Sequence, residues 1–265
     1  MRVGVIGGGA MGEAIVAGLL RDGAATRQDI TVSDVSEPRR RELAERYGVA
    51  ATADNAPAAA GDVVVLAVKP QVLPSILSEL KGRLQPAQTV ISVAAGVPLE
   101  RLREGLAHQA VVRAMPNMPA QVGAGMTVWT APGDAPAHVR EAAREVLATL
   151  GRELYVPDEK YIDMATAVSG SGPAYVFMFL EALTDAAVHI GLPADMARDL
   201  ATQTVLGAAR LAEQTGRHPA ELRNLVASPG GTTAEALLKL EESGLRGAIG
   251  RAVEAAFDKA KRLGK

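Results

Sequence analysis

Cysteine is absent from the 265 residues of this chain. Its absence excludes a disulfide framework, a thiolate metal site and a cysteine nucleophile, and it fits a reducing compartment. Aromatic residues are scarce, with one tryptophan, four tyrosines and three phenylalanines. An excess of one charge is also missing, because 28 lysines and arginines face 30 acidic residues for a formal net charge of -2. We therefore expect no nucleic-acid partner, since such proteins normally carry a basic excess or a basic stripe with stacking aromatics.

Patterns typical of metal sites and membrane spans are missing as well. The four histidines are far apart in the sequence and form no pair at helical spacing, so we expect no metal site. The apolar runs are short, and charged residues interrupt the candidate helix from Pro173 to Ile190, so we expect no membrane span. The chain enters a strand-like run directly after Arg2, which leaves no room for a signal peptide and favours the cytoplasm.

The chain has two halves with different sequence patterns. Short β-branched runs recur from Val3 to about Val156 and alternate with stretches of helical spacing. The runs lie at 3–6, 30–32, 63–68, 89–93, 111–112, 126–129 and 154–156. This alternation predicts a mostly parallel sheet with helices on both faces. After Pro157 the pattern becomes helical, with breaks expected at 170–173, 191–193, 216–219, 229–231 and 243–244. We therefore predict two domains, residues 1–158 and residues 159–265.

The predicted helix from Pro173 to Ile190 is apolar on more than one face. Its apolar residues are Val176, Phe177, Phe179, Leu180, Leu183, Ala186, Ala187 and Ile190. A small helical half cannot easily cover such a helix alone, so we predict that another subunit buries it. The alternative is a helix at the centre of its own bundle.

A glycine-rich turn follows the first strand-like run. Gly7, Gly9 and Gly12 fit the spacing G-x-G-x-x-G and open a helical pattern. Gly7 permits a tight turn, Gly9 lets the backbone approach a pyrophosphate, and Gly12 lets the helix pack on the strand. Because a strand precedes the motif and a helix follows it, we predict dinucleotide binding. The alternative is a strand-to-helix turn that binds nothing.

The end of the second predicted strand carries mixed signals about the coenzyme. Asp34 lies 22 residues after Gly12, where an acidic residue would hold the ribose 2'-OH of NAD. Ser33 and Ser36 flank it, and the arginines at 39–41 open the next helix, so a 2'-phosphate also finds hydroxyls and guanidinium groups nearby. The residues leave open the choice between NADPH and NADH, and a solvated helix face is the alternative role for the arginines.

Three further loops follow predicted strands, at Ala67–Pro70, Val93–Gly96 and Met115–Pro119. Ligands of parallel sheets bind outside the carboxyl ends of the strands. Because these loops are rich in small residues or marked by glycine and proline, the backbone can come close to a flat ring. We therefore predict that they line the nicotinamide pocket.

The string Ser228–Glu235 is the most informative part of the helical half. Thr232 and Glu235 fit a capping box, which predicts a helix start at Thr232 after a pliable turn at Gly230 and Gly231. The N-H groups of such a helix start form a seat for a carboxylate, with the Thr233 hydroxyl beside it. The alternative is an ordinary, well-capped surface helix.

These motifs, together with the string Ser169–Tyr175, resemble pyrroline-5-carboxylate reductase in order and spacing over nearly the whole chain. The resemblance implies reduction of 1-pyrroline-5-carboxylate to L-proline by NADPH, with NADH possible, as the last step of proline biosynthesis. It implies an α/β fold in which an N-terminal Rossmann-like dinucleotide-binding domain precedes an all-α dimerisation domain. It further implies a homodimer, often assembled into a ring of dimers, with a small imino acid as the substrate.

The resemblance also implies site residues, carried over by position. The expected cofactor contacts are Gly7, Gly8, Gly9, Ala10, Met11, Gly12, Ser33, Asp34, Ser36, Asn55, Ala67, Val68, Lys69, Pro70, Val93, Ala94 and Ala95, and the residue patterns described above add Arg39 and Asn117. The expected substrate contacts are Glu159, Ser228, Gly230, Gly231, Thr232 and Thr233. The Thr233 hydroxyl, beside the carboxylate seat, makes Thr233 our candidate catalytic residue. Two positions depart from the family: Asp34 replaces a small hydroxyl residue of NADPH-preferring members, and Leu225, beside Asn224, replaces a common asparagine.

Two other functions compete with this interpretation. The β-hydroxyacid dehydrogenases resemble this chain in overall plan, but they place a lysine early in the long helix, and Gly172–Val176 contains none. Without that acid-base residue, an alcohol oxidation is hard to support. A non-catalytic dinucleotide sensor would need no substrate seat, and the Pro-Gly-Gly-Thr-Thr string at 229–233 argues against it.

Overall fold

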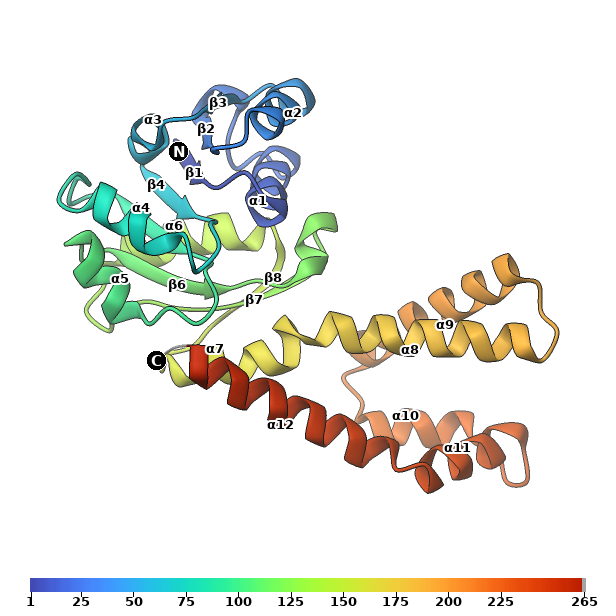
Figure 1. The fold of residues 1–265 in the computed structure, drawn as a ribbon. Coiled ribbons are helices and arrows are strands. Elements are labelled where there is room, and N and C mark those ends of the chain that lie inside the picture. Colours follow the sequence, from blue (N-terminus) through green and yellow to red (C-terminus); the bar gives the residue numbers. More distant parts are fainter. Residues whose placement is uncertain (264–265) are drawn as a thin grey trace. The chain divides into compact units, whose positions relative to one another are not determined.

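The computed structural model describes residues 1–263, and they divide into two compact units (Figure 1). The first unit contains Met1–Ser171 together with the chain from Ala256 onward. The second unit contains Gly172–Ala255. Residues 159–171 therefore group with the sheet, and the domain boundary at residue 158 stays a prediction.

One sheet of eight strands forms the centre of the first unit. The strands are β1 (Val3–Ile6), β2 (Ile30–Ser33), β3 (Ala50–Thr52), β4 (Val63–Leu66), β5 (Thr89–Ser92), β6 (Val111–Met115), β7 (Gly125–Thr130) and β8 (Gly151–Tyr155). Their order is β3-β2-β1-β4-β5-β6-β7-β8, and only β6 and β7 pair antiparallel. The mostly parallel sheet is thus confirmed. The sequence pattern missed β3, because a three-residue strand with two alanines lacks a β-branched run.

Helices cover both faces of this sheet. They are α1 (Ala10–Arg21), α2 (Glu37–Tyr47), α3 (Asn55–Ala59), α4 (Leu73–Leu80), α5 (Leu99–Leu106), α6 (Ala137–Ala148) and α7 (Lys160–Ala165). Short turns of 3-10 helix lie at η1 (Arg27–Asp29) and η2 (Met118–Val122), and a π-helical turn, η3 (Thr166–Gly170), follows α7.

Two hydrophobic cores lie on opposite faces of the sheet. Val63 and Val65 of β4 belong to the core under α1, α2 and α6. Val64 and Leu66 belong to the core under α3, α4 and α5. Because successive side chains of a strand point to opposite faces, a strand buried on both faces must be apolar throughout. This requirement explains the continuous valine and leucine run of β4.

The second unit is entirely helical. It contains α8 (Gly172–His189), α9 (Ala194–Thr215), α10 (Pro219–Val226), α11 (Thr232–Glu242) and most of α12 (Leu245–Leu263), whose last residues belong to the first unit. The helix breaks expected from the glycine and proline positions are confirmed at every junction. Among residues 1–263, no helix combines the length and apolarity that a membrane crossing requires.

Helix α8 exposes apolar side chains on most of its surface. None of its residues is buried. Its half-buried residues Leu180, Leu183 and Ala187 share one face, and α9 is its main neighbour within the unit. Outside that face, Phe177 is 54% exposed and Met178 is 72% exposed. Such a contiguous apolar surface is typical of an interface that a second chain covers.

Candidate active site

The coenzyme turn, Gly7–Gly12, lies where the strand order of the sheet reverses. Strand β1 pairs with β2 on one side and with β4 on the other. Gly7 donates its N-H to the carbonyl of Ser33 at 2.8 Å, and Ala67 donates to the carbonyl of Ile6 at 2.8 Å. A Cβ atom on Gly7, whose φ is 101°, would lie 2.7 Å from the carbonyl oxygen of Ala67. The turn therefore adjoins the ends of β2 and β4, which is the crevice where parallel sheets bind dinucleotides.

The turn also presents an anion seat at the start of α1. A Cβ atom on Gly12 would lie 2.0 Å from the carbonyl oxygen of Gly7, so this close contact requires glycine. Above Gly9 the space is open, since a Cβ there would meet no atom within 4 Å. Among residues 1–263 the N-H groups of Ala10 and Met11 have no acceptor. Free N-H groups at a helix start, with room above them, fit a pyrophosphate.

The carboxylate of Asp34 is held at the end of β2 by two backbone groups. Its Oδ2 accepts the N-H of Gly8 at 2.8 Å, and its Oδ1 accepts the N-H of Ser36 at 2.8 Å. Ser33 is buried, and its hydroxyl donates to Oδ1 of Asn55 at 2.7 Å. Ser33 thus orients Asn55 and does not face the coenzyme turn with its own hydroxyl.

Arg39 is committed to other protein groups in the structure. Its Nε donates to the carbonyl of Gly8, its Nη1 pairs with Glu42 at 2.6 Å, and its Nη2 pairs with Glu13. Burial alone would raise the pKa of Glu13, but hydrogen bonds from Arg39 and Tyr47 outweigh burial and hold the pKa below its usual range. Arg39 therefore links the coenzyme turn to α1 and α2.

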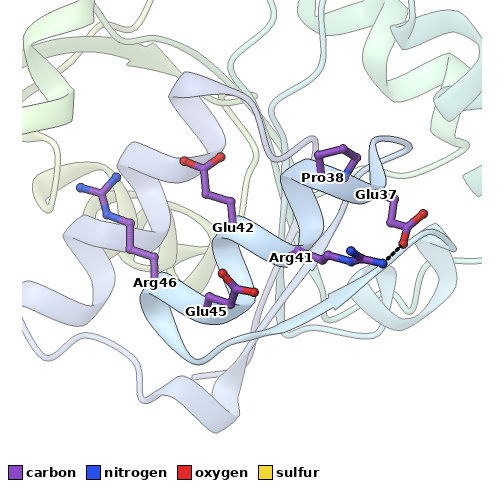
Figure 2. Close-up of a pocket in the computed structure, with 6 residues that line it drawn as sticks. All are labelled: Glu37, Pro38, Arg41, Glu42, Glu45 and Arg46. Atoms are coloured by element: carbon purple, nitrogen blue, oxygen red, sulfur yellow. Dashed lines mark hydrogen bonds and ion pairs between the residues drawn. The ribbon is translucent and has the colours of Figure 1, made fainter.

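The outer face of α2 forms a charged hollow on the surface. Figure 2 shows its lining, which is Glu37, Pro38, Arg41, Glu42, Glu45 and Arg46. Arg41 pairs with Glu37 one turn away on the same helix. Every lining residue belongs to this one helix and both charge signs alternate, so the hollow is a solvated helix face. For Arg41 the solvated alternative is therefore the better description.

The predicted nicotinamide loops follow three neighbouring strands. Ala67–Pro70 follows β4, Val93–Gly96 follows β5, and Met115–Pro119 contains the end of β6. Parallel pairing of these strands brings their carboxyl ends to one edge of the sheet. Asn117 uses both ends of its amide on backbone: its Nδ2 donates to the carbonyl of Ser169 at 3.0 Å, and its Oδ1 accepts the N-H of Met126 at 2.8 Å.

Arg113, which the sequence patterns did not single out, lies on β6 with its side chain 5% exposed. Its Nη1 pairs with Oε1 of Glu159 at 2.6 Å, and its Nη2 pairs with Oδ1 of Asp163 at 2.7 Å. The same Glu159 oxygen accepts the N-H of Leu99 at 2.7 Å. This Arg113 cluster links the start of α5 to α7, and it engages Oε1 of Glu159, an expected substrate contact. An arginine inside the apolar run Val111–Met115 was the available signal.

The turn before α11 is built as a tight β-turn. The N-H of Gly231 donates to the carbonyl of Ser228 at 3.1 Å, with Pro229 second and Gly230 third at a φ of 67°. These positions match a type II turn. The helix start at Thr232 is confirmed.

The predicted capping box at this helix start is wrong. Gly231 is the N-cap residue of α11, and no side chain caps the helix. Because Thr232 already has helical geometry, it cannot act as the N-cap. The N-H groups of Thr232 and Thr233 have no acceptor among residues 1–263, which leaves them available to an anion. Thr233 itself is half-buried and lies in the first turn of α11.

Comparisons with known proteins cover the whole chain. Residues 159–263 match a family model described as pyrroline-5-carboxylate reductase dimerisation. Residues 2–96 match a model described as NADP oxidoreductase, coenzyme F420-dependent. The chain is 44% identical over 266 residues to a pyrroline-5-carboxylate reductase of Synechocystis, covering 100% of this chain and 99% of that protein.

Solved structures show the same similarity. A pyrroline-5-carboxylate reductase of Coxiella burnetii matches with a TM-score of 0.92 at 40% identity, covering 100% of this chain and 98% of the other. A pyrroline carboxylate reductase of Plasmodium falciparum, solved with NADP bound, matches with a TM-score of 0.90 at 29% identity, with the same coverage.

Substitutions at Gly9 and Gly12 should distinguish a residue needed for coenzyme binding from a residue needed for stability. We expect Gly12→Ala to lower the free energy of unfolding by about 1–3 kcal/mol, because the new methyl group overlaps the Gly7 carbonyl. We expect Gly9→Ala to leave stability unchanged but to raise the Kd of NADPH by about tenfold, because the methyl group occupies the anion seat. Urea titration and fluorescence quenching measure the two effects. Equal NADPH binding by Gly9→Ala and the native chain would contradict the proposed seat.

Arg113→Met should destabilise the protein by about 3–5 kcal/mol, because it leaves two carboxylates close together without their cation. The matched control is Arg144→Met, which removes a pair whose arginine is exposed and should cost at most about 1 kcal/mol. Urea unfolding at one fixed protein concentration measures both. Adding Glu159→Gln and Asp163→Asn to Arg113→Met should restore most of the loss. Equal stability of the two single variants would refute a structural role for the Arg113 cluster.

Proposed function

Because the chain belongs to the pyrroline-5-carboxylate reductase family, we infer that it reduces 1-pyrroline-5-carboxylate to L-proline with a hydride from NAD(P)H. This reaction is the last step of proline biosynthesis. The observation that carries the assignment is full-length similarity at 44% identity, combined with an open anion seat at the coenzyme turn. This similarity favours the reductase over the two alternatives, a non-catalytic dinucleotide sensor and a β-hydroxyacid dehydrogenase.

The coenzyme belongs at the strand ends of the first unit. We assign its pyrophosphate to the N-H groups of Ala10 and Met11 at the start of α1, because they are free and the space above Gly9 is open. We also assign Asn55, whose amide is oriented by the Ser33 hydroxyl, to the coenzyme site together with Asp34. The loops Ala67–Pro70 and Val93–Ala95 provide small groups for the nicotinamide ring.

The substrate carboxylate is assigned to the start of α11. The N-H groups of Thr232 and Thr233 are free, and the positive end of the helix dipole favours an anion there. The type II turn holds Ser228 and Gly230 beside them. A carboxylate can therefore be held without a basic side chain. The Arg113 cluster holds Oε1 of Glu159, which accepts two hydrogen bonds, and leaves Oε2 for the substrate contact expected at Glu159.

The reaction depends more on the positioning of coenzyme and substrate than on a strongly acidic side chain. The reduced nicotinamide supplies a hydride, and a protonated cyclic imine accepts it readily. The hydride adds to the imine carbon, and the electrons of the C=N π-bond become the lone pair of the ring nitrogen. Thr233 is assigned to that nitrogen, where its hydroxyl holds the protonated imine in place. Holding the two reacting carbons within about 3–3.5 Å supplies the entropic part of the rate enhancement.

The enzyme forms a homodimer through its helical unit. The exposed apolar surface of α8 is the physical reason, because water contact with Phe177 and Met178 is unfavourable. As finer parts of the proposal, we place the dimers in a ring and the enzyme in the cytoplasm. Support for the second comes from the lack of cysteine, which fits a reducing compartment.

Thr233→Ala should lower kcat/KM for pyrroline-5-carboxylate by about 5- to 150-fold, the cost of a hydrogen bond of about 1–3 kcal/mol in the transition state. The Kd of NADPH should stay unchanged. Thr233→Ser keeps the hydroxyl and should recover most of the loss. Steady-state kinetics with both variants test the assignment, and a wild-type kcat/KM for Thr233→Ala would remove Thr233 from the mechanism.

Phe177→Glu should dissociate the dimer, because a carboxylate replaces an apolar side chain that is 54% exposed in the single chain. Activity should fall with the dimer fraction, as it should on dilution of the native enzyme. Val122→Glu is the matched control, since Val122 is an exposed apolar residue of the first unit. Light scattering reports the oligomeric state. A fully active monomer would show that activity does not require the dimer.

A further inference from the structure

We propose that Asp34 and Arg40 form two alternative subsites for the 2' position of the adenosine ribose, so that this reductase uses NADH and NADPH with similar efficiency. Asp34 receives the ribose hydroxyls of NADH, and Arg40 receives the 2'-phosphate of NADPH. The inference rests on the proposed function, because it concerns the coenzyme of that reaction.

Asp34 places a carboxylate at the position where dinucleotide folds bind the ribose. Two backbone N-H groups, from Gly8 and Ser36, each at 2.8 Å, set the orientation of its carboxylate. Among residues 1–263 no cationic side chain pairs with it. Each oxygen of an ionised carboxylate has lone pairs left for further donors. The carboxylate is therefore ready to accept hydrogen bonds from ribose hydroxyls, and it repels a phosphate.

Two of the three neighbouring arginines have carboxylate partners in the structure. Arg39 uses its donors on the Gly8 carbonyl, Glu13 and Glu42. Moving Arg39 to a phosphate would leave the partly buried Glu13 with one arginine fewer and release the Gly8 carbonyl. Arg41 is paired with Glu37 on the solvated face of α2 (Figure 2).

Arg40 is the arginine that remains. Its Nη1 donates to the backbone carbonyls of Asp34 at 2.8 Å and Val35 at 3.0 Å, which holds the guanidinium beside the end of β2. It has no carboxylate partner among the described residues. A guanidinium carries five N-H donors, so donors remain for a phosphate. The exposed hydroxyl of Ser36, which has no partner within residues 1–263, lies in the same segment.

The acid and the cation therefore act on different coenzymes. Asp34 favours the coenzyme with a free 2'-hydroxyl, whereas Arg40 offsets the repulsion that Asp34 exerts on a 2'-phosphate. Removing one group should shift selectivity in one direction, and removing the other should shift it in the opposite direction. This opposition is the signature of the proposal, because general damage to the site would weaken both coenzymes together.

The test compares NADPH with NADH in native enzyme and variants. We expect the two kcat/KM values of the native enzyme to lie within about tenfold of each other. Asp34→Asn keeps an acceptor for the Gly8 N-H and removes the charge, so the NADPH/NADH ratio should rise at least tenfold. Arg40→Met should lower that ratio at least tenfold. The matched control is Arg41→Met, one residue along α2, which should leave the ratio within twofold of the native value.

Calorimetric titration with NADP+ and NAD+ provides a readout that is independent of turnover. The ratio of the two Kd values should follow the same opposite shifts, and Asp34→Ser serves as a second variant should Asp34→Asn fail to fold. Parallel shifts in both variants, or unchanged NADP+ binding in Arg40→Met, would overturn the proposal. An enzyme that binds both coenzymes with these shifts but does not oxidise them with pyrroline-5-carboxylate would support the two subsites and refute the proposed reaction.

Discussion

The close approach of three backbone segments at the reversal of strand order is the constraint on which the coenzyme site depends. At this point β1, the start of α1 and the loop after β4 come too near each other for side chains: Cβ atoms on Gly7 and Gly12 would meet carbonyl oxygens at 2.7 and 2.0 Å. The absence of side chains brings free N-H groups to the surface of the crevice. Packing and anion binding thus share one cause, since the contact that lets α1 lie on the sheet also exposes the helix start.

Side chains from the β2–α2 segment hold the same turn from the other side. The Gly8 N-H donates to Asp34, and the Gly8 carbonyl accepts from Arg39. Arg39 is in turn held by Glu13, whose carboxylate also accepts from Arg46 and from the Tyr47 hydroxyl. The charged groups at the end of β2 are therefore used first to fix the turn. In the proposed coenzyme site, selectivity between NADH and NADPH depends on the few polar groups that this network leaves free.

The sequence predicted the parts of the fold that follow from local patterns. The continuous apolar run of β4 and the glycine and proline breaks between the helices of the second unit are examples, and the structure confirms them. It did not predict β3, whose two alanines carry no strand signal, or the N-cap of α11, because a Thr-x-x-Glu spacing does not say which residue turns the chain. Arg113 was missed because its partners lie 46 and 50 residues away in sequence.

The helices of the second unit bury too little apolar surface within one chain to explain their stability. Its helices bury few side chains of their own: α8, α10 and α11 contain no buried residue, and α9 contains two buried alanines. Burial of apolar area is the dominant favourable term in folding, so helices that leave Phe177, Met178 and Ile190 in water lack most of that term. A second chain supplies the missing burial. We therefore infer that folding of α11, where we place the substrate carboxylate, is coupled to dimer formation.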